Sequence, residues 1–173
     1  ITVVNMLQWS GMPEDLAKLA KGAFDRGQPL IQFGTFFATS LSLALVPAIS
    51  EAVAQRQHQM IASRSEVAIR LTFLLGLPAS FGLALLAEPI NVMLYGDTNG
   101  TEALAVQSFT IVFATLSISS AGILQGLGRG MRPARNLFIG VVVKLILNLV
   151  LVPIWGITGG AMSTVLAYLV AMG

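Results

Sequence analysis

Long apolar stretches constrain this chain more than any other feature. A helix needs about 20 mostly apolar residues to cross a bilayer. About five stretches qualify: residues 30–49, 71–87, 103–128, 136–152 and 157–172. Only residues 136–152 include a charged residue, Lys144. The sequence therefore predicts an all-α fold, a multi-pass transmembrane helical bundle, located in the cell membrane.

Composition supports a membrane protein and excludes several other classes. Only 10% of the residues are charged and 55% are hydrophobic, whereas soluble domains carry about 25% charged residues. The net charge of +2 is too small to indicate nucleic-acid binding. The chain has no cysteine, so it has neither a disulfide framework nor a cysteine metal site.

Prolines and glycines divide the apolar stretches. Residues 153–160 read PIWGITGG, which predicts a tight turn between two antiparallel helices. Pro47 and Pro78 lie inside apolar stretches and predict kinks or helix ends. Such breaks are tolerated in membranes where neighbouring helices satisfy the backbone.

A short amphipathic helix is predicted over residues 13–25. Its apolar residues recur at i, i+3, i+4, i+7 and i+8 and therefore share one helical face. Pro13 suits the first helical turn, and Glu14 precedes Lys18 by the spacing of a helical ion pair. The apolar face fits a helix at the membrane interface or a connecting helix packed on the protein.

Arginines are unevenly distributed among the connections. Residues 52–70 and 129–135 contain three arginines each, whereas residues 96–102 contain two acidic residues and no basic one. Two predicted spans separate the arginine-bearing connections, so both lie on the same side. Since Lys and Arg mark the cytoplasmic side, we predict that these connections are cytoplasmic.

The ends of the chain suggest a longer protein. The sequence begins with Ile1 and stops within an apolar run. We interpret residues 1–173 as an internal fragment of a single membrane domain, with the first and last helices truncated. Residues 1–9 resemble the end of an earlier span.

Several segments together resemble a known transporter family. They read FDRGQPLIQFGTFFATSLSLALVPAISEA, PINVMLY, ILQGLGRGMRPARN, KLILNLVLVP and GITGGAMSTVLAY, in that order. Their order is similar to that in the polysaccharide and lipid II flippase branch of the multidrug/oligosaccharidyl-lipid/polysaccharide exporter superfamily. Within that branch, the sequence most resembles stage V sporulation protein B-like proteins.

The resemblance implies both an architecture and a function. The complete protein would have two pseudo-symmetric lobes, and this chain would form most of the second. It would translocate a polyprenyl-diphosphate-linked cell-wall or polysaccharide precursor by alternating access. Its partners would be that anionic lipid-linked sugar and the membrane lipids.

Lys144 is the first candidate for substrate binding. A charge in the bilayer core costs about 3 kcal/mol on insertion scales, so Lys144 should face the protein interior or a watery cavity. There it could hold a diphosphate together with Asn148, which shares its helix face four residues on. Alternatively, its long side chain snorkels towards the arginine-bearing side. Both alternatives stay open.

Arg26 is the second candidate. The triplet Phe24-Asp25-Arg26 is similar to an aromatic-Asp-Arg context that the lipid II flippases place near their central cavity. The resemblance therefore implies substrate binding by Arg26. A simple ion pair with its neighbour Asp25 is the alternative.

No enzyme signature is found in the sequence. His58 lies alone in a polar segment, and no residues have metal-ligand spacing, so we predict no catalytic residue, cofactor or metal. The alternative function is a cation-coupled multidrug exporter, which needs a membrane-buried acid. Glu88 is the only carboxylate within an apolar stretch.

Overall fold

The structure is a computed structural model that describes residues 13–172, and these residues are all-α. The helices are α2 (Glu14–Asp25), α3 (Gly27–Ala54), α4 (His58–Leu85), α5 (Ala87–Tyr95), α6 (Thr101–Ser108), α7 (Thr110–Gly126) and α8 (Met131–Met172). Within residues 13–172, four helical stretches are long and apolar enough to cross a membrane. The predicted all-α, multi-pass helical bundle is confirmed. Residues 1–9, the predicted end of an earlier span, lie outside the described residues.

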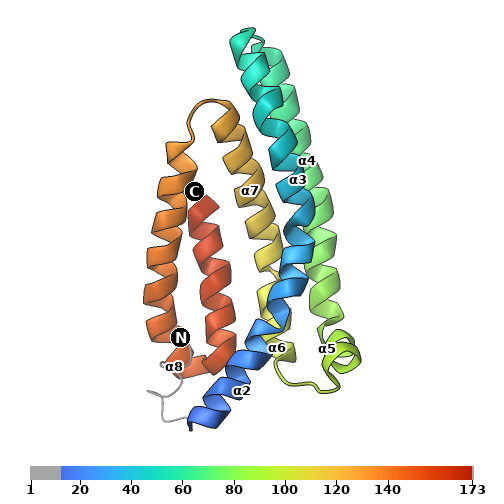
Figure 1. Cartoon of the computed structure of the whole chain (residues 1–173), viewed down its shortest axis with the longest axis vertical. Coiled ribbons are helices and arrows are strands. Elements are labelled where there is room, and N and C mark those ends of the chain that lie inside the picture. The colour runs from blue at the N-terminus through green and yellow to red at the C-terminus, as the bar shows by residue number, and fades with distance from the viewer. Residues whose placement is uncertain (1–12, 173) are drawn as a thin grey trace.

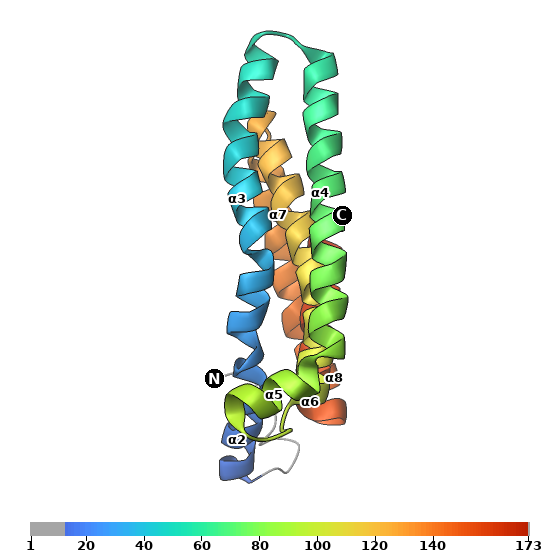
Figure 2. The same ribbon diagram turned by 90° about the vertical axis from the view of Figure 1, so that its right-hand side faces the viewer.

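Helix α7 forms the centre of the bundle, with α3 and α4 on one side and α8 on the other (Figures 1 and 2). In the most apolar part of the α6–α7 stretch, 67% of residues are buried, against 22% or less in the other three candidate spans. Small residues along α7 allow this close approach. They include Ser119, Gly122 and Gly126, all of which are buried.

The outer helices expose large apolar side chains. Phe33 is 79% exposed, Leu85 81% and Phe138 69%. Such a surface is unsuited to water and fits lipid or other membrane helices.

Helix α8 consists of two antiparallel halves that reverse at Gly156 (Figure 1). Gly156 adopts φ 58° and ψ −135°, a backbone conformation that is essentially restricted to glycine. The two halves pack closely, because a Cβ on Gly140 would lie 2.9 Å from the Cβ of Ala171. The turn predicted within residues 153–160 is therefore confirmed.

Two boundaries differ from the sequence predictions. Helices α3 and α4 continue through Pro47 and Pro78, so neither proline ends a helix. The span predicted over residues 71–87 ends slightly earlier, because α4 stops at Leu85. Helix α5 then crosses the end of the bundle as a separate helix (Figure 2). The expected third span, residues 103–128, corresponds to the candidate span Thr101–Gly126, which α6 and α7 form with a turn at Phe109.

The connections gather at two opposite ends of the bundle. The α3–α4 and α7–α8 turns lie at one end, and the α5–α6 connection and the reversal of α8 lie at the other (Figure 1). The two arginine-bearing connections therefore lie on the same side, as predicted. We call this the arginine side. Its assignment to the cytoplasm stays a prediction.

Candidate functional site

Arg26 lies at the junction of α2 and α3, at the end opposite the arginine side. Its Nη1 donates hydrogen bonds to Asp97 Oδ1 at 2.9 Å and to Oδ2 at 3.1 Å. The guanidinium also lies 4.7 Å from the centre of the Tyr95 ring, within cation–π range. Tyr95 Oη in turn donates to the Arg26 carbonyl at 3.2 Å.

This geometry overturns the neighbour-pair interpretation of Arg26. Asp25 accepts a hydrogen bond from Lys21, four residues earlier on α2. Arg26 instead pairs with Asp97, 71 residues away. The hydrogen bond from Arg26 lowers the pKa of the half-buried Asp97 carboxyl. The pair therefore fastens the start of α3 to the α5–α6 connection.

Part of the Arg26 guanidinium is still available to a ligand. Its side chain is 32% exposed. Within residues 13–172, the guanidinium donates side-chain hydrogen bonds only through Nη1, and both of them go to Asp97. An arginine has five N–H donors in a planar fork that matches carboxylate and phosphate oxygens. Arg26 can accordingly hold Asp97 and still present donors to an anion.

Lys144 lies in the seam between the two halves of α8. It is half-buried and borders a small pocket of about 160 Å³. The pocket is otherwise lined by Leu137, Gly140, Val141, Ala167, Tyr168 and Ala171. Most of this lining is apolar, and in the described part of the chain Lys144 has no ion pair.

Asn148 lies one helical turn from Lys144 and faces the same seam. It is 5% exposed, and its Oδ1 accepts a hydrogen bond from Ser163 of the other half of α8. Because the amide oxygen is already engaged, Asn148 acts first as a packing residue of the hairpin. The prediction that Lys144 and Asn148 share a face fits this arrangement.

The structure does not join the three candidates into one cluster. Within the described residues, no hydrogen bond or ion pair connects Arg26 with Lys144 or Asn148. Sequence reasoning also missed Asp97 and Tyr95 as partners of Arg26. Ser163 was predictable from the seam register, since a reversal centred near Gly156 pairs residues 148 and 163.

Hydroxyl groups join the helices in the bundle interior. Thr72 Oγ1 and Ser119 Oγ lie 2.7 Å apart, between α4 and α7. Ser80 Oγ donates to the Ser108 carbonyl at 2.9 Å. Such bonds hold membrane helices together where water is absent.

Gln107 is a buried polar residue without such bonds. Its side chain is 1% exposed, and neither amide atom has a partner among the described residues.

Glu88 does not supply the buried acid that a cation-coupled exporter needs. It is exposed and lies in the first turn of α5, beyond the end of α4. An acid in a helical first turn is favoured by the helix dipole, so its position has a purely local explanation.

Comparisons with known proteins agree on one family. The family model described as lipid II flippase MurJ matches residues 31–173. The chain is 40% identical over 163 residues to the uncharacterized membrane protein YabM of Bacillus subtilis (strain 168), covering 94% of this chain and 31% of that protein. It is 32% identical over 138 residues to stage V sporulation protein B of the same strain, covering 79% and 27% of the two chains.

A third relative carries the family description in its own name. The chain is 27% identical over 150 residues to lipid II flippase MurJ of Bacillus subtilis (strain 168), covering 84% of this chain and 28% of that protein. The chain thus spans between 27% and 31% of the length of these three relatives. No solved structure matches it.

Proposed function

The chain belongs to the lipid II flippase MurJ family, and on that premise we propose that it is part of a flippase for a polyprenyl-diphosphate-linked cell-wall or polysaccharide precursor. It is a multi-pass protein of the cell membrane. The family match, which extends over residues 31–173, is the observation that carries the proposal. Transport would proceed by alternating access between this lobe and a second lobe.

The charges of the lobe suit an anionic substrate. A diphosphate carries concentrated negative charge, and a membrane cavity that receives it needs cations. Arg26 and Lys144 are the candidates, because Arg26 keeps free donors and Lys144 has no carboxylate partner among the described residues. We assign to Asn148 a supporting role, since its bond to Ser163 fixes the helix face that Lys144 shares.

The two cations would act differently. Arg26 can bind phosphate oxygens through two parallel N–H donors, and its pair with Asp97 fixes the position of its guanidinium. Lys144 would act as a point charge within a largely apolar seam. A cation in such surroundings attracts an anion more strongly as water leaves the cavity. The multidrug-exporter alternative lacks a comparable observation, because Glu88 is exposed.

Translocation by the full-length protein tests the proposal directly. The protein would be reconstituted into vesicles with a fluorescent polyprenyl-diphosphate-linked sugar in both leaflets. Accessibility of the sugar to an impermeant reagent then reports its movement between leaflets. We expect protein-dependent movement of this lipid and none of a neutral polyprenyl lipid. Movement of neither lipid, by protein shown to be folded, contradicts the proposal.

A further inference from the structure

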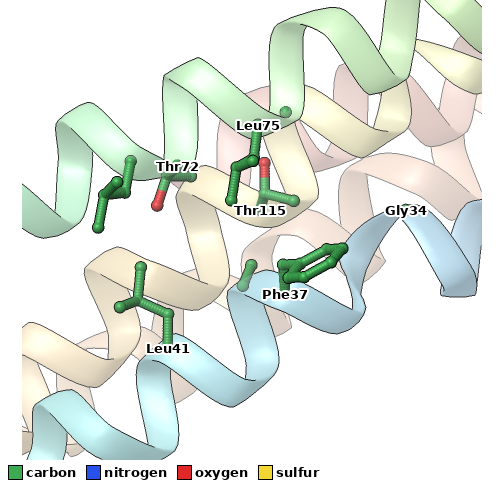
Figure 3. A pocket seen from close by; sticks show the side chains of 9 residues that line it. Gly34, Phe37, Leu41, Thr72, Leu75 and Thr115 are labelled. Atoms are coloured by element: carbon green, nitrogen blue, oxygen red, sulfur yellow. The ribbon is translucent and has the colours of Figure 1, made fainter.

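A continuous groove runs between α3 and α4 on the surface of the bundle. Its inner part has a volume of about 240 Å³ and lies over α7, where Thr115 forms the floor. Figure 3 shows Phe37 and Leu41 on α3 across from Thr72 and Leu75 on α4. A second hollow of about 420 Å³ shares Leu41 and Leu71 with the first and continues towards the arginine side.

The hydroxyl groups in the inner part are already bonded within the protein. Thr72 Oγ1 contacts Ala68 O and Ser119 Oγ, and Thr115 Oγ1 donates to Val112 O. The surface that remains for a ligand is therefore apolar. Its glycines and alanines, such as Gly34 and Ala38, leave room for a chain of slender cross-section.

The groove ends at a cation. Arg64 lines the second hollow, is half-buried and donates a hydrogen bond to the Ala48 carbonyl across the groove. It has no ion pair within residues 13–172, while the nearby Glu66 is engaged with Arg70. Beyond it, a polar hollow that shares Ser63 includes Arg56 and His58.

The polarity of the groove therefore changes in one direction, from apolar at mid-span to cationic at the arginine side. The distance from Gly34 to Ala48 is about 21 Å along α3, at about 1.5 Å per residue. One leaflet contributes about 15 Å of hydrocarbon, half of a core of about 30 Å. The groove thus accommodates the full depth of one leaflet's alkyl chain with its headgroup at Arg64.

We propose that this groove binds one anionic phospholipid from the arginine-side leaflet. An alkyl chain lies along Leu41 and Leu71, and the phosphate accepts hydrogen bonds from Arg64. A structural lipid here fills the space between α3 and α4, which α7 alone does not close. The proposal is independent of the transported substrate, because it concerns a lipid of the surrounding membrane.

Native mass spectrometry of the delipidated full-length protein tests this assignment. Phosphatidylglycerol and phosphatidylcholine with identical chains are added separately, and the bound fraction is measured. The unmodified protein should bind phosphatidylglycerol more tightly. Arg64→Gln should weaken that binding about tenfold, the factor for one charge-assisted hydrogen bond, and abolish the headgroup preference. Arg64→Lys should retain most of it.

Matched controls separate the groove from general effects. Arg70→Gln removes another arginine from α4, but one that is 77% exposed and paired with Glu66, and should leave binding unchanged. Leu71→Trp obstructs the groove and should reduce the binding of both lipids. Leu85→Trp adds the same bulk at an exposed position outside it and should not.

Three outcomes overturn the proposal. The first is equal binding of the two phospholipids by the unmodified protein. The second is binding that neither Arg64→Gln nor Leu71→Trp alters, as expected if another helix of the full chain fills the groove. The third is displacement of phosphatidylglycerol by a polyprenyl diphosphate whose own binding depends on Arg64 and Leu71. That result would assign the groove to the transported lipid instead.

Discussion

Arg26 and Asp97 are 71 residues apart in the sequence, yet Arg26 Nη1 lies 2.9 Å from Asp97 Oδ1. The ion pair closes the end of the bundle opposite the arginine side, where α2, α3 and the α5–α6 connection meet (Figure 1). Arg26, which we propose as a substrate-binding residue, therefore also joins α3 to the α5–α6 connection. Variants at this pair must distinguish the two roles.

Asp97→Asn should lower the thermal unfolding midpoint of the full-length protein in a pH-dependent way. The pKa of Asp97 is lowered in the folded state by its hydrogen bond from Arg26. A lowered folded pKa gives stability that is complete above the ordinary Asp value of about 3.9 and is lost as the pH falls through the folded pKa. The difference from the unmodified protein should therefore be constant near neutrality and shrink below about pH 4.

Asp15→Asn is the control for that measurement, since Asp15 is exposed on α2. Asp15 has no ion pair within the described residues, so Asp15→Asn should change the unfolding midpoint at neutral pH less than Asp97→Asn does. A difference for Asp97→Asn that persists undiminished into strong acid would mean that the ion pair does not cause it.

Gly159→Ala should destabilise the hairpin of α8. A Cβ on Gly159 would overlap the carbonyl oxygen of Leu151, so the backbone of the other half must move. Overpacking of this kind costs on the order of 1–3 kcal/mol and should appear as a lower unfolding midpoint. Gly82→Ala is the matched control, because a Cβ there meets nothing within 4 Å. Equal midpoints for the two variants would contradict the close seam.

Gln107→Met should stabilise the protein. The Gln107 side chain is buried, and both amide atoms lack partners in the described part of the chain. An unpaired buried amide costs roughly 1–3 kcal/mol, as judged from protein mutational data, and methionine is similar in shape without that cost. Gln125→Met, at an exposed position, should have little effect. A lower midpoint for Gln107→Met would instead indicate a bonding partner outside residues 13–172.

Cysteine labelling should assign the two sides of the membrane. This chain has no cysteine, so single cysteines can be introduced on a cysteine-free full-length background. An impermeant reagent applied to intact cells should label Thr98→Cys and leave Arg56→Cys and Arg132→Cys unlabelled, because arginine-bearing connections favour the cytoplasm. Labelling of Arg132→Cys with silence at Thr98→Cys would reverse the orientation.

The sequence predicted those features that depend on local properties of the chain. Hydropathy located the candidate spans, because the bilayer imposes one length and one polarity on every crossing helix. The turn near Gly156 was predictable, since a proline and several glycines interrupt an apolar run. The distribution of arginines placed two connections on the same side, as the structure confirms.

Features that depend on packing could not be predicted in this way. The partner of Arg26 is determined by how α5 crosses the end of the bundle, and no sequence spacing encodes that crossing. Helices α3 and α4 continue through Pro47 and Pro78, since neighbouring helices can compensate for a lost backbone bond. Hydropathy also cannot reveal the α3–α4 groove, because lipid-facing and groove-lining residues are equally apolar.

The final prediction concerns Lys144. Its two candidate roles, substrate binding and snorkelling to the membrane interface, predict opposite effects of an alanine substitution on translocation. It lies half-buried in the seam of α8 without an ion pair among the described residues. If it holds the diphosphate, Lys144→Ala and Lys144→Glu should both impair translocation by the full-length protein at matched membrane levels. Lys144→Arg should be milder, since the charge is retained although the geometry changes.

Snorkelling predicts the reverse for the alanine variant. Lys144 borders a pocket whose lining extends towards the arginine side, through Leu137 and Ala171, and a lysine stem can reach along such a path to the interface. Lys144→Ala would then remove a charge that only anchors the helix at the interface. Translocation would be unchanged, and the unfolding midpoint would equal or exceed that of the unmodified protein. Loss of translocation with an unchanged midpoint supports substrate binding, because removal of an anchor does not produce that combination. Full translocation by Lys144→Ala would leave Arg26 as the cationic candidate in this lobe.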